Sequence, residues 1–413
     1  MTAPLLALVG LALLAHVLLQ HSRFRDALRA RSTPPRLVGG YPSITVIRPV
    51  RGKDVGAQEN FVAALDTGYP GEVETVFVVD DETDPAHPLL ERVVAAHRAA
   101  GAPGKARLLV AGPPPAGRTG KLNAMMAGMR VARGELVAFG DSDSRPDRDV
   151  LRVLVETLLS IPRAGCAFAP VVVPDPARTA GDLGYALMLN GLYTPTVALA
   201  TVPTGDLPFI MGQLMVFRRE ALEAAGGLQC ADGHLVDDMQ IGSCLSAAGW
   251  RNVPASHPLR LVTGGMDLVS FLALMRRWLS FQRGGLPFSF TAPQFVRGLE
   301  FGFGLAAGVG LAAARHLLAA VPALALMIAV GWSVATLHVA HGGAPIAPRH
   351  LWVPLMLYLA GPLALVSSVV LPAVRWRGRE YALDAHARLD LPSAASGPRG
   401  PGQADDSFAR SRS

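Results

Sequence analysis

Hydrophobic positions in the middle of the chain fall into alternating short and longer runs. The short runs are bounded by Gly, Pro or charged residues and read as buried strands: SITVIRP, ETVFVVD, ARLLVAG, ELVAF, CAFAPVVV and QLMVF. The longer runs repeat apolar residues at helical spacing and predict helices: AQENFVAALDT, AHPLLERVVAAHRAA, KLNAMMAGMRVA and DVLRVLVETLLS. Alternation of this kind is typical of a mostly parallel α/β sheet, which we predict for residues 41–285.

The N-terminal stretch is strongly apolar. It carries no charge from Pro4 to Gln20, and at about 1.5 Å per residue it is roughly 25 Å long, just enough to cross a bilayer. No basic region precedes it and no small-residue cleavage site follows it, which favours a retained anchor at 1–21 over a cleaved signal peptide. A basic linker at 22–40 follows.

The C-terminal third contains three further apolar segments: Phe301–Ala314, Leu317–Ala340 and Leu351–Val374. The last two are long enough to cross a bilayer and predict a transmembrane hairpin at 316–374. The first is short and ends at Arg315, which predicts an interfacial or re-entrant segment at 286–315. Residues 375–413 are expected to form a basic tail, with disorder in its last two dozen Gly/Pro/Ser-rich residues.

Arginines flank the apolar blocks on both sides of the central region: Arg23, Arg25, Arg29, Arg31 and Arg36 before it, Arg375, Arg377 and Arg379 after it. The positive-inside rule predicts that both flanks and the domain between them are cytoplasmic. We therefore expect an integral protein of the bacterial inner membrane. The net charge of +6 fits an anionic membrane face, and no aromatic-interleaved basic stripe points to nucleic acid.

The three cysteines, Cys166, Cys230 and Cys244, fall in separate elements and lack the spacing of metal ligands. They are expected to be reduced core thiols, as in a cytoplasmic domain.

Acidic residues occur in pairs where strands end or helices begin: Asp80 with Asp81, Asp141 with Asp143, and Asp237 with Asp238. Each pair alone also reads as an Asx turn or a helix cap, and Asp147 is placed to cap the run that follows it. Two close carboxylates repel each other unless a cation lies between them. Because open α/β sheets bind ligands beyond the carboxyl ends of their strands, the pairs together predict a site for a divalent cation and a polyoxygenated ligand.

Two basic features are candidates to complete this site. In GRTGKLNAMMAG, Lys121 enters a helix whose free amide groups favour an anion. In LMRRWLSFQRG, the sequence brings Arg276, Arg277 and Trp278 together just before the membrane block. That second segment also reads as an interfacial helix with Arg and Trp at headgroup depth.

Taken in order, these motifs resemble family 2 glycosyltransferases, and more narrowly the ceramide glucosyltransferases. The resemblance covers the anchor, residues 43–278 and the C-terminal membrane block. It is carried by ITVIRPVRGKD, NFVAALDTGYPGEVETVFVVDDETDPA, GKLNAMMAG, DSDS, FIMGQLMVFRREALEAAGGL and LVDDMQIGSCLSAAGWR. It implies a GT-A (Rossmann-like) glycosyltransferase domain at 41–285, held by an N-terminal anchor helix and C-terminal transmembrane helices.

The resemblance also implies roles for the first two acidic pairs. Asp81 would contact the uracil or ribose of the nucleotide, with Asp80 a close second choice. Asp141 and Asp143 would hold Mg²⁺ or Mn²⁺ against the donor diphosphate, where the metal absorbs charge on the departing UDP. Lys121 would add positive charge beside them.

On the acceptor side, the resemblance implies that Asp238 is the catalytic base, with Asp237 beside it. Arg277 and Trp278 would be the Arg-Trp end of the family's (Gln/Arg)-x-x-Arg-Trp motif. The first position of that motif is Leu274 here, which cannot donate to a phosphate or sugar oxygen. Substitutes considered for this contact are Arg276, Gln282 and Arg283.

The implied reaction is inverting transfer of a hexose, with glucose from UDP-glucose expected first, to a lipid hydroxyl, with ceramide expected first. The aromatic segment from Phe281 to Phe295, with Phe288 and Phe290, is expected to form the floor for the lipid. Alternatives within the reaction class are another sugar, or a hopanoid or diacylglycerol acceptor. Two further alternatives have a different function. One is a membrane protein that binds a nucleotide sugar without turnover, and the other is a processive polysaccharide synthase, for which few membrane spans are available.

Overall fold

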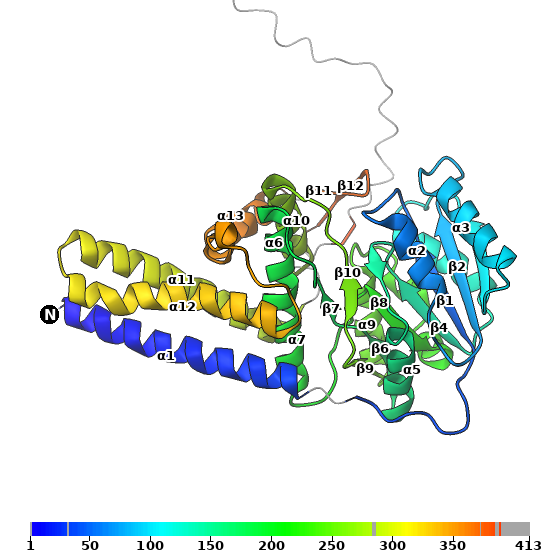
Figure 1. Cartoon of the computed structure of the whole chain (residues 1–413), viewed down its shortest axis with the longest axis horizontal. Coiled ribbons are helices and arrows are strands. Elements are labelled where there is room, and N and C mark those ends of the chain that lie inside the picture. The colour runs from blue at the N-terminus through cyan, green and yellow to red at the C-terminus, as the bar shows by residue number, and fades with distance from the viewer. Residues whose placement is uncertain (1, 31–32, 283–285, 372, 385–387, 390–413) are drawn as a thin grey trace, which may run out of the picture.

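A seven-stranded sheet forms the centre of the computed structural model, which describes residues 2–30, 33–282, 286–371, 373–384 and 388–389 (Figure 1). The strand order is β3-β2-β1-β4-β8-β6-β9, and β8 runs antiparallel to both of its neighbours. The predicted mostly parallel α/β sheet is therefore confirmed. The strands are β1 (Ile44–Pro49), β2 (Val73–Val79), β3 (Lys105–Val110), β4 (Leu136–Gly140), β6 (Ala164–Phe168), β8 (Leu214–Arg218) and β9 (Arg251–Pro254).

Helices cover both faces of this sheet, because its central strands are apolar on both sides. Every residue of β4 is buried, and successive residues contact opposite helical layers. Val137 belongs to the core that includes Leu122 of α4, whereas Ala138 belongs to the core that includes Leu154 of α5. The four predicted helices are present as α2 (Ala57–Leu65), α3 (His87–Ala99), α4 (Gly120–Val131) and α5 (Val150–Ser160).

The second half of the domain adds elements that bring the sheet close to the membrane helices. A small sheet of order β5-β10-β7 lies at the edge. Its strands are β5 (Ser144–Arg145), β7 (Val171–Val172) and β10 (Leu259–Leu261). The helices are α6 (Ala180–Leu187), a π-helical turn (Met188–Tyr193), α7 (Thr194–Thr201), α8 (Arg219–Ala224), a 3₁₀ turn (Leu228–Ala231), α9 (Asp237–Ala247) and α10 (Leu268–Gln282).

Three long helices, α1 (Thr2–Arg29), α11 (Phe288–Ala313) and α12 (Leu317–Ala340), lie side by side and extend away from the sheet (Figure 1). After a 3₁₀ turn at Pro348–His350, α13 (Val353–Val370) packs mainly against α10 and also contacts α12, α6 and α11. Among the described residues, these four helices are long and apolar enough to cross a membrane. The predicted N-terminal and C-terminal membrane helices are therefore confirmed.

The pairing of the C-terminal helices differs from the prediction. The segment 286–315, expected to be interfacial or re-entrant, contains the long helix α11, which forms a hairpin with α12. The sequence obscured this helix because Arg297 and Glu300 interrupt its apolar run. Both are buried by partners across the bundle: Arg297 donates to Ser333 Oγ at 2.7 Å, and Glu300 lies 2.5 Å from His16 Nδ1.

The region after α13 also differs from the prediction. Residues 375–413 were expected to be a tail, but β11 (Ala373–Trp376) and β12 (Arg379–Ala382) form an antiparallel hairpin. The hairpin is folded because Val374 and Leu383 are buried against Leu235 of the sheet domain. The final residues 390–413, predicted to be disordered, lie outside the described residues.

Glycines set the closest approach of the membrane helices. A Cβ at Gly304 would lie 2.8 Å from the carbonyl oxygen of Ala323, and one at Gly308 would lie 2.6 Å from Leu324 Cδ2. Both glycines are on α11, four residues apart, and therefore on one face. Small residues at this spacing let two helix backbones pack closely in a membrane.

We predict that Gly304→Ala destabilises the protein by about 1–3 kcal/mol, because the added methyl overpacks the α11–α12 contact. Thermal unfolding of the purified protein in detergent measures the effect. Gly302→Ala is the matched control on the same helix, since a Cβ there meets nothing within 4 Å. Equal unfolding temperatures for the two variants would contradict the prediction.

Candidate functional site

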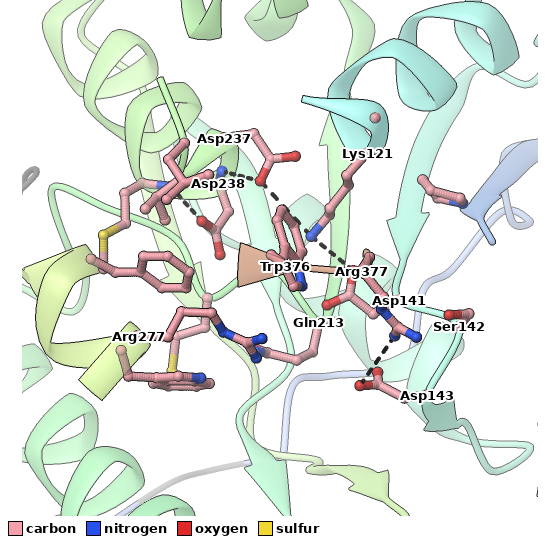
Figure 2. Close-up of a pocket in the computed structure, with 18 of the residues that line it drawn as sticks. Lys121, Asp141, Ser142, Asp143, Gln213, Asp237, Asp238, Arg277, Trp376 and Arg377 are labelled. Atoms are coloured by element: carbon pink, nitrogen blue, oxygen red, sulfur yellow. Dashed lines mark hydrogen bonds and ion pairs between the residues drawn. The ribbon is translucent and has the colours of Figure 1, made fainter. Parts of the chain in front are cut away.

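Side chains from distant parts of the chain line one pocket of about 370 Å³ beside the carboxyl ends of β1, β2 and β4 (Figure 2). One half is charged and the other is apolar. The charged half is lined by Arg51, Asp80, Lys121, Asp141, Asp143, Asp237, Asp238, Arg277, Arg377 and Arg379. The apolar half includes Tyr193, Phe209, Ile210, Trp278, Phe281, Leu286 and Phe290. Of the predicted site residues, the structure brings all but Asp81 to this pocket.

Lys121 connects two of the acidic pairs. It is the second residue of α4, whose start is capped by Thr119 Oγ1 accepting from the Leu122 amide at 3.1 Å. Its Nζ lies 2.8 Å from Asp141 Oδ1 and 3.9 Å from Asp237 Oδ1, as Figure 2 shows. Burial lowers the pKa of Lys121, but the surrounding carboxylates outweigh it and raise this pKa above its ordinary value. Lys121 therefore stays a cation.

A buried arginine fixes the turn that carries Asp141 and Asp143. Arg48, on β1, is 1% exposed and donates through Nη2 to the Asp141 carbonyl and, at 3.0 Å, to Ser144 Oγ. The Ser144 hydroxyl also donates to the Asp141 carbonyl at 2.7 Å. With the backbone of this turn held from behind, both carboxylates face the pocket. The next acidic side chain, Asp147, accepts from the Val150 amide and caps α5, as the sequence suggested.

Asp143 has the features of a ligand for a cation. Desolvation in the cleft, and then the nearby Asp141 and Asp54 carboxylates, raise the pKa of Asp143 to about 6. Its Oδ1 atom is buried and has no hydrogen-bond partner among the residues that the structure describes. Among the described residues, no group of three or more His, Cys, Asp or Glu side chains is arranged to hold a metal. Two carboxylates nevertheless fit Mg²⁺ or Mn²⁺, which commonly take one or two protein carboxylates and complete their shell with phosphate and water.

The third acidic pair opens α9. The Asp238 amide donates to Asp237 Oδ1 at 3.0 Å, and the Met239 amide donates to Asp238 Oδ1 at 2.9 Å. Burial, with the Asp237 carboxylate next in size among the causes that raise it, brings the pKa of Asp238 to about 7. Burial also raises the pKa of Asp237. Gly212 makes room for this pair, because a Cβ there would lie 2.3 Å from Asp238 Oδ2.

The first acidic pair is divided between the pocket and the solvent. Asp80 is buried and pairs with Arg51 and with Arg379, the latter at 2.9 Å. Asp81, the first choice for the nucleotide contact, is exposed and accepts from the Thr83 amide at 2.8 Å. Neighbouring side chains at the end of a strand point in opposite directions, so only one of the two can face the pocket. Of the two, Asp80 lines the pocket, which favours it for the nucleotide contact.

The Arg-Trp motif lies on α10. Arg277 and Trp278 both line the pocket, and Trp278 packs edge-on against Tyr193 at 5.0 Å between ring centroids. Leu274 packs in the core instead. Arg276, considered as a substitute for it, donates to the Leu371 carbonyl at 2.6 Å and does not line the pocket. The other substitutes, the Gln282 side chain and Arg283, lie outside the described residues.

Three residues that line the pocket, and Arg48 behind it, were missed by the sequence reading. Arg377 and Arg379 were used only to orient the membrane helices, and Gln213 and Arg48 were not singled out. The signal for Arg48 was a charged residue inside the apolar strand ITVIRP. Nothing local marks Gln213, whose buried Oε1 atom has no hydrogen-bond partner in the part of the chain that the structure describes.

Comparisons with known proteins identify the family of this chain. The model of glycosyl transferase family 21 matches residues 2–389. Ceramide glucosyltransferase 3 of Caenorhabditis elegans is 24% identical over 289 residues, which is 68% of this chain and 60% of that protein. Ceramide glucosyltransferase 1 of the same organism is 21% identical over 249 residues, 60% of this chain and 51% of that protein. The chain thus spans about half to three fifths of the length of these curated relatives, and the resemblance to them is confirmed.

A solved structure supports the fold. The mannosyltransferase PcManGT of Pyrobaculum calidifontis, in complex with GDP-Man and Mn²⁺, superposes with a TM-score of 0.54 at 21% identity. The match covers 87% of this chain and 99% of that chain. The predicted GT-A fold is confirmed by this similarity.

We predict that Asp238→Asn stabilises the protein more at pH 8.5 than at pH 5. The pKa of Asp238 is about 7 in the folded protein and near its ordinary value of about 4 when unfolded. As pH rises, the unfolded chain therefore releases this proton at a lower pH than the folded protein. The free energy of unfolding of the wild type falls as pH rises from the unfolded pKa to the folded pKa. Asn does not titrate, so the variant does not lose this stability at high pH. The difference in the free energy of unfolding is on the order of a few kcal/mol, since each pKa unit is about 1.4 kcal/mol.

Thermal unfolding at the two pH values tests this prediction. Glu220→Gln on α8, where the side chain is 67% exposed, is the control and should not change the pH dependence. A stability difference between Asp238→Asn and wild type that is the same at both pH values would contradict it.

Proposed function

Because this chain belongs to glycosyl transferase family 21, we propose that it is an inverting membrane glycosyltransferase. It moves a hexose from a UDP-sugar to a lipid hydroxyl, and glucose and ceramide are the first donor and acceptor we assign. The observation that carries this proposal is the pocket itself. Its charged half suits a sugar nucleotide with a divalent cation, and its apolar half continues into the helices that reach the membrane.

In the donor half, Asp141 and Asp143 would hold Mg²⁺ or Mn²⁺. The bound metal would neutralise charge on the diphosphate leaving group. Lys121 supplies a permanent positive charge within 2.8 Å of Asp141, at the N-terminus of α4, where amide groups favour an anion. Asp80, which is buried beside Arg51 and Arg379, would contact the nucleoside.

In the centre of the pocket, Asp238 would accept the proton of the attacking hydroxyl. A pKa of about 7 suits a base that works near neutral pH, because about half of the carboxyl groups are then deprotonated and the carboxylate is a stronger base than an ordinary aspartate. Asp237 shares this environment, so the two carboxyls titrate as a pair. Attack from the face opposite the leaving group inverts the anomeric centre, and an α-linked donor gives a β-glycolipid.

The apolar half is proposed to receive the lipid. Phe290, at the start of α11, is 4% exposed and packs edge-on against Phe209 at 4.8 Å between ring centroids. Trp278 and Phe281 of α10 line the same side. A two-tailed lipid loses about 0.8 kcal/mol for each CH₂ group that leaves the bilayer. An acceptor wall that begins on the membrane helices avoids this loss.

The proposed orientation follows from the same arrangement. The α11–α12 hairpin leaves the sheet domain and returns to it (Figure 1). We propose that α1, α11 and α12 cross the membrane and that α13, which packs against α10 and α6 of the sheet domain, does not. The β11–β12 hairpin and the sheet domain then lie on one side of the membrane. The arginines after α1 and α13 favour the cytoplasmic side. We propose the bacterial inner membrane as the location.

We predict that membranes containing this protein transfer radiolabel from UDP-glucose to ceramide when Mg²⁺ or Mn²⁺ is present. Asp238→Asn should abolish this transfer, with kcat/KM lower by a factor of roughly 10² or more. In the wild type, kcat/KM should rise with pH to a plateau above about pH 7, since the deprotonated carboxylate is the active form and its pKa is about 7. Glu220→Gln is the exposed control.

The outcomes of this assay are distinct. Nucleotide-sugar binding without labelled lipid, after other UDP-sugars, hopanoids and diacylglycerol have been tried, would favour a binding protein over an enzyme. Full activity of Asp238→Asn would remove Asp238 from the role of base.

We predict further that Phe290→Asp raises KM for the lipid acceptor at least tenfold and leaves KM for the sugar nucleotide within about twofold. The reason is that a charge in an apolar wall is poorly solvated and disfavours a lipid chain beside it. The control, Phe290→Leu, keeps the same position apolar and should leave both KM values near those of the wild type. Unchanged acceptor kinetics in Phe290→Asp, measured in lipid nanodiscs, would remove this wall from the acceptor site.

A further inference from the structure

The β11–β12 hairpin returns from the last apolar helix to the donor half of the pocket. Its register pairs Trp376 with Arg379, which leaves Arg377 and Gly378 as a two-residue turn. This turn is held against the loop after β1: Arg51 Nε donates to the Arg377 carbonyl at 2.7 Å, and Arg377 Nη1 donates to the Arg51 carbonyl at 3.3 Å. The tip of the hairpin is thus fixed in the pocket wall, as Figure 2 shows for Trp376 and Arg377.

Arg377 and Arg379 of the hairpin both point at carboxylates. Arg377 Nη1 lies 2.5 Å from Asp54 Oδ1, and its Nη2 lies 4.0 Å from Asp143 Oδ2. Arg379 Nη2 lies 2.9 Å from Asp80 Oδ2. The other terminal nitrogen of Arg379 is buried and has no hydrogen-bond partner among the described residues. It lies where a Cβ of Gly120 would be only 2.2 Å away, at the start of α4.

The backbone conformation of the turn is unfavourable for arginine. Arg377 has φ 51° and Gly378 has φ 75°, the left-handed values of a type I′ turn, which favours Asn, Asp or Gly at the first of these positions. A non-glycine residue with positive φ needs compensation from its surroundings. Arg377 finds it in Asp54 and in the reciprocal bonds with Arg51, so an arginine side chain is held at this point of the pocket.

We propose that Arg377 and Arg379 bind the diphosphate of the sugar-nucleotide donor, and that the C-terminal hairpin is therefore part of the donor site. This inference rests on the proposed function. A diphosphate between the α4 N-terminus and the Asp141–Asp143 pair lies within reach of both guanidinium groups. Guanidinium groups bind phosphate oxygens in a bidentate manner. The two carboxylates that now hold them, Asp54 and Asp80, keep the arginines extended until the donor arrives.

The test is binding rather than turnover. The full-length protein in detergent is titrated calorimetrically with UDP and with uridine, each in EDTA and in Mn²⁺. Arg377→Asn and Arg379→Gln should weaken UDP binding roughly tenfold or more, as expected for loss of a charge-assisted hydrogen bond, and leave uridine binding unchanged. Arg377→Asn is chosen because Asn suits the turn, so this variant should keep the hairpin folded. Glu380→Gln, at an exposed neighbour on β12, is the control.

The titrations with UDP and uridine have three informative outcomes. Loss of UDP affinity without loss of uridine affinity, with Glu380→Gln like wild type, supports the proposal. Wild-type UDP affinity in both arginine variants, or equal weakening of UDP and uridine, overturns it and leaves the proposed function standing. Wild-type protein that does not bind UDP, even in Mn²⁺, overturns the proposed function, and this inference with it.

Discussion

The repulsion among the aspartates of the cleft is the constraint on which this structure depends. Five of them line one pocket: Asp80, Asp141, Asp143, Asp237 and Asp238. Two unit charges about 4 Å apart repel by about 4 kcal/mol at an effective dielectric constant near 20. A cleft with this many carboxylates folds only if cations lie between them or if some carboxyls stay protonated. Both occur, since Lys121 links two pairs and the pKa of Asp238 is raised to about 7.

The cations that balance this charge come from segments far apart in the sequence. Lys121 comes from α4, Arg51 from the loop after β1, and Arg377 and Arg379 from beyond the last apolar helix. The pocket is therefore complete only after the chain has passed through the α11–α12 hairpin and returned. The membrane helices therefore have a second role besides anchoring the domain. They return the chain to the pocket, where Arg377 and Arg379 pair with carboxylates.

Much of the fold could be predicted from the sequence, since strands buried on both faces and amphipathic helices leave strong local patterns. The positions of the acidic pairs at strand and helix ends were equally visible, and five of those six side chains line the pocket. The choice between Asp80 and Asp81 was not visible, because a shift of one residue reverses the direction of a side chain. Nor was α11 recognised at its full length, because Arg297 and Glu300 have partners on other helices.

The C-terminal hairpin shows most clearly why the remainder was missed. RWRGRE reads as a cytoplasmic basic flank. The positive-inside rule accounts for all of its arginines, so the sequence alone gives no reason to expect a second role. Its other role depends on long-range contacts: Val374 packs against Leu235, and Arg377 pairs with Asp54, more than three hundred residues away along the chain. A charge run has no periodicity that would distinguish a solvated flank from a hairpin with one face in a pocket.

The substitution at Leu274 is consistent with this arrangement. The leucine packs in the core, and two residues later Arg276 donates to the carbonyls of Leu371 at 2.6 Å and Ala373 at 3.0 Å. It thereby ties the end of α13 to the start of β11. Arg277, the next residue, faces the pocket. One arginine of α10 thus fixes the segment that leads into the β11–β12 hairpin, while its neighbour lines the site.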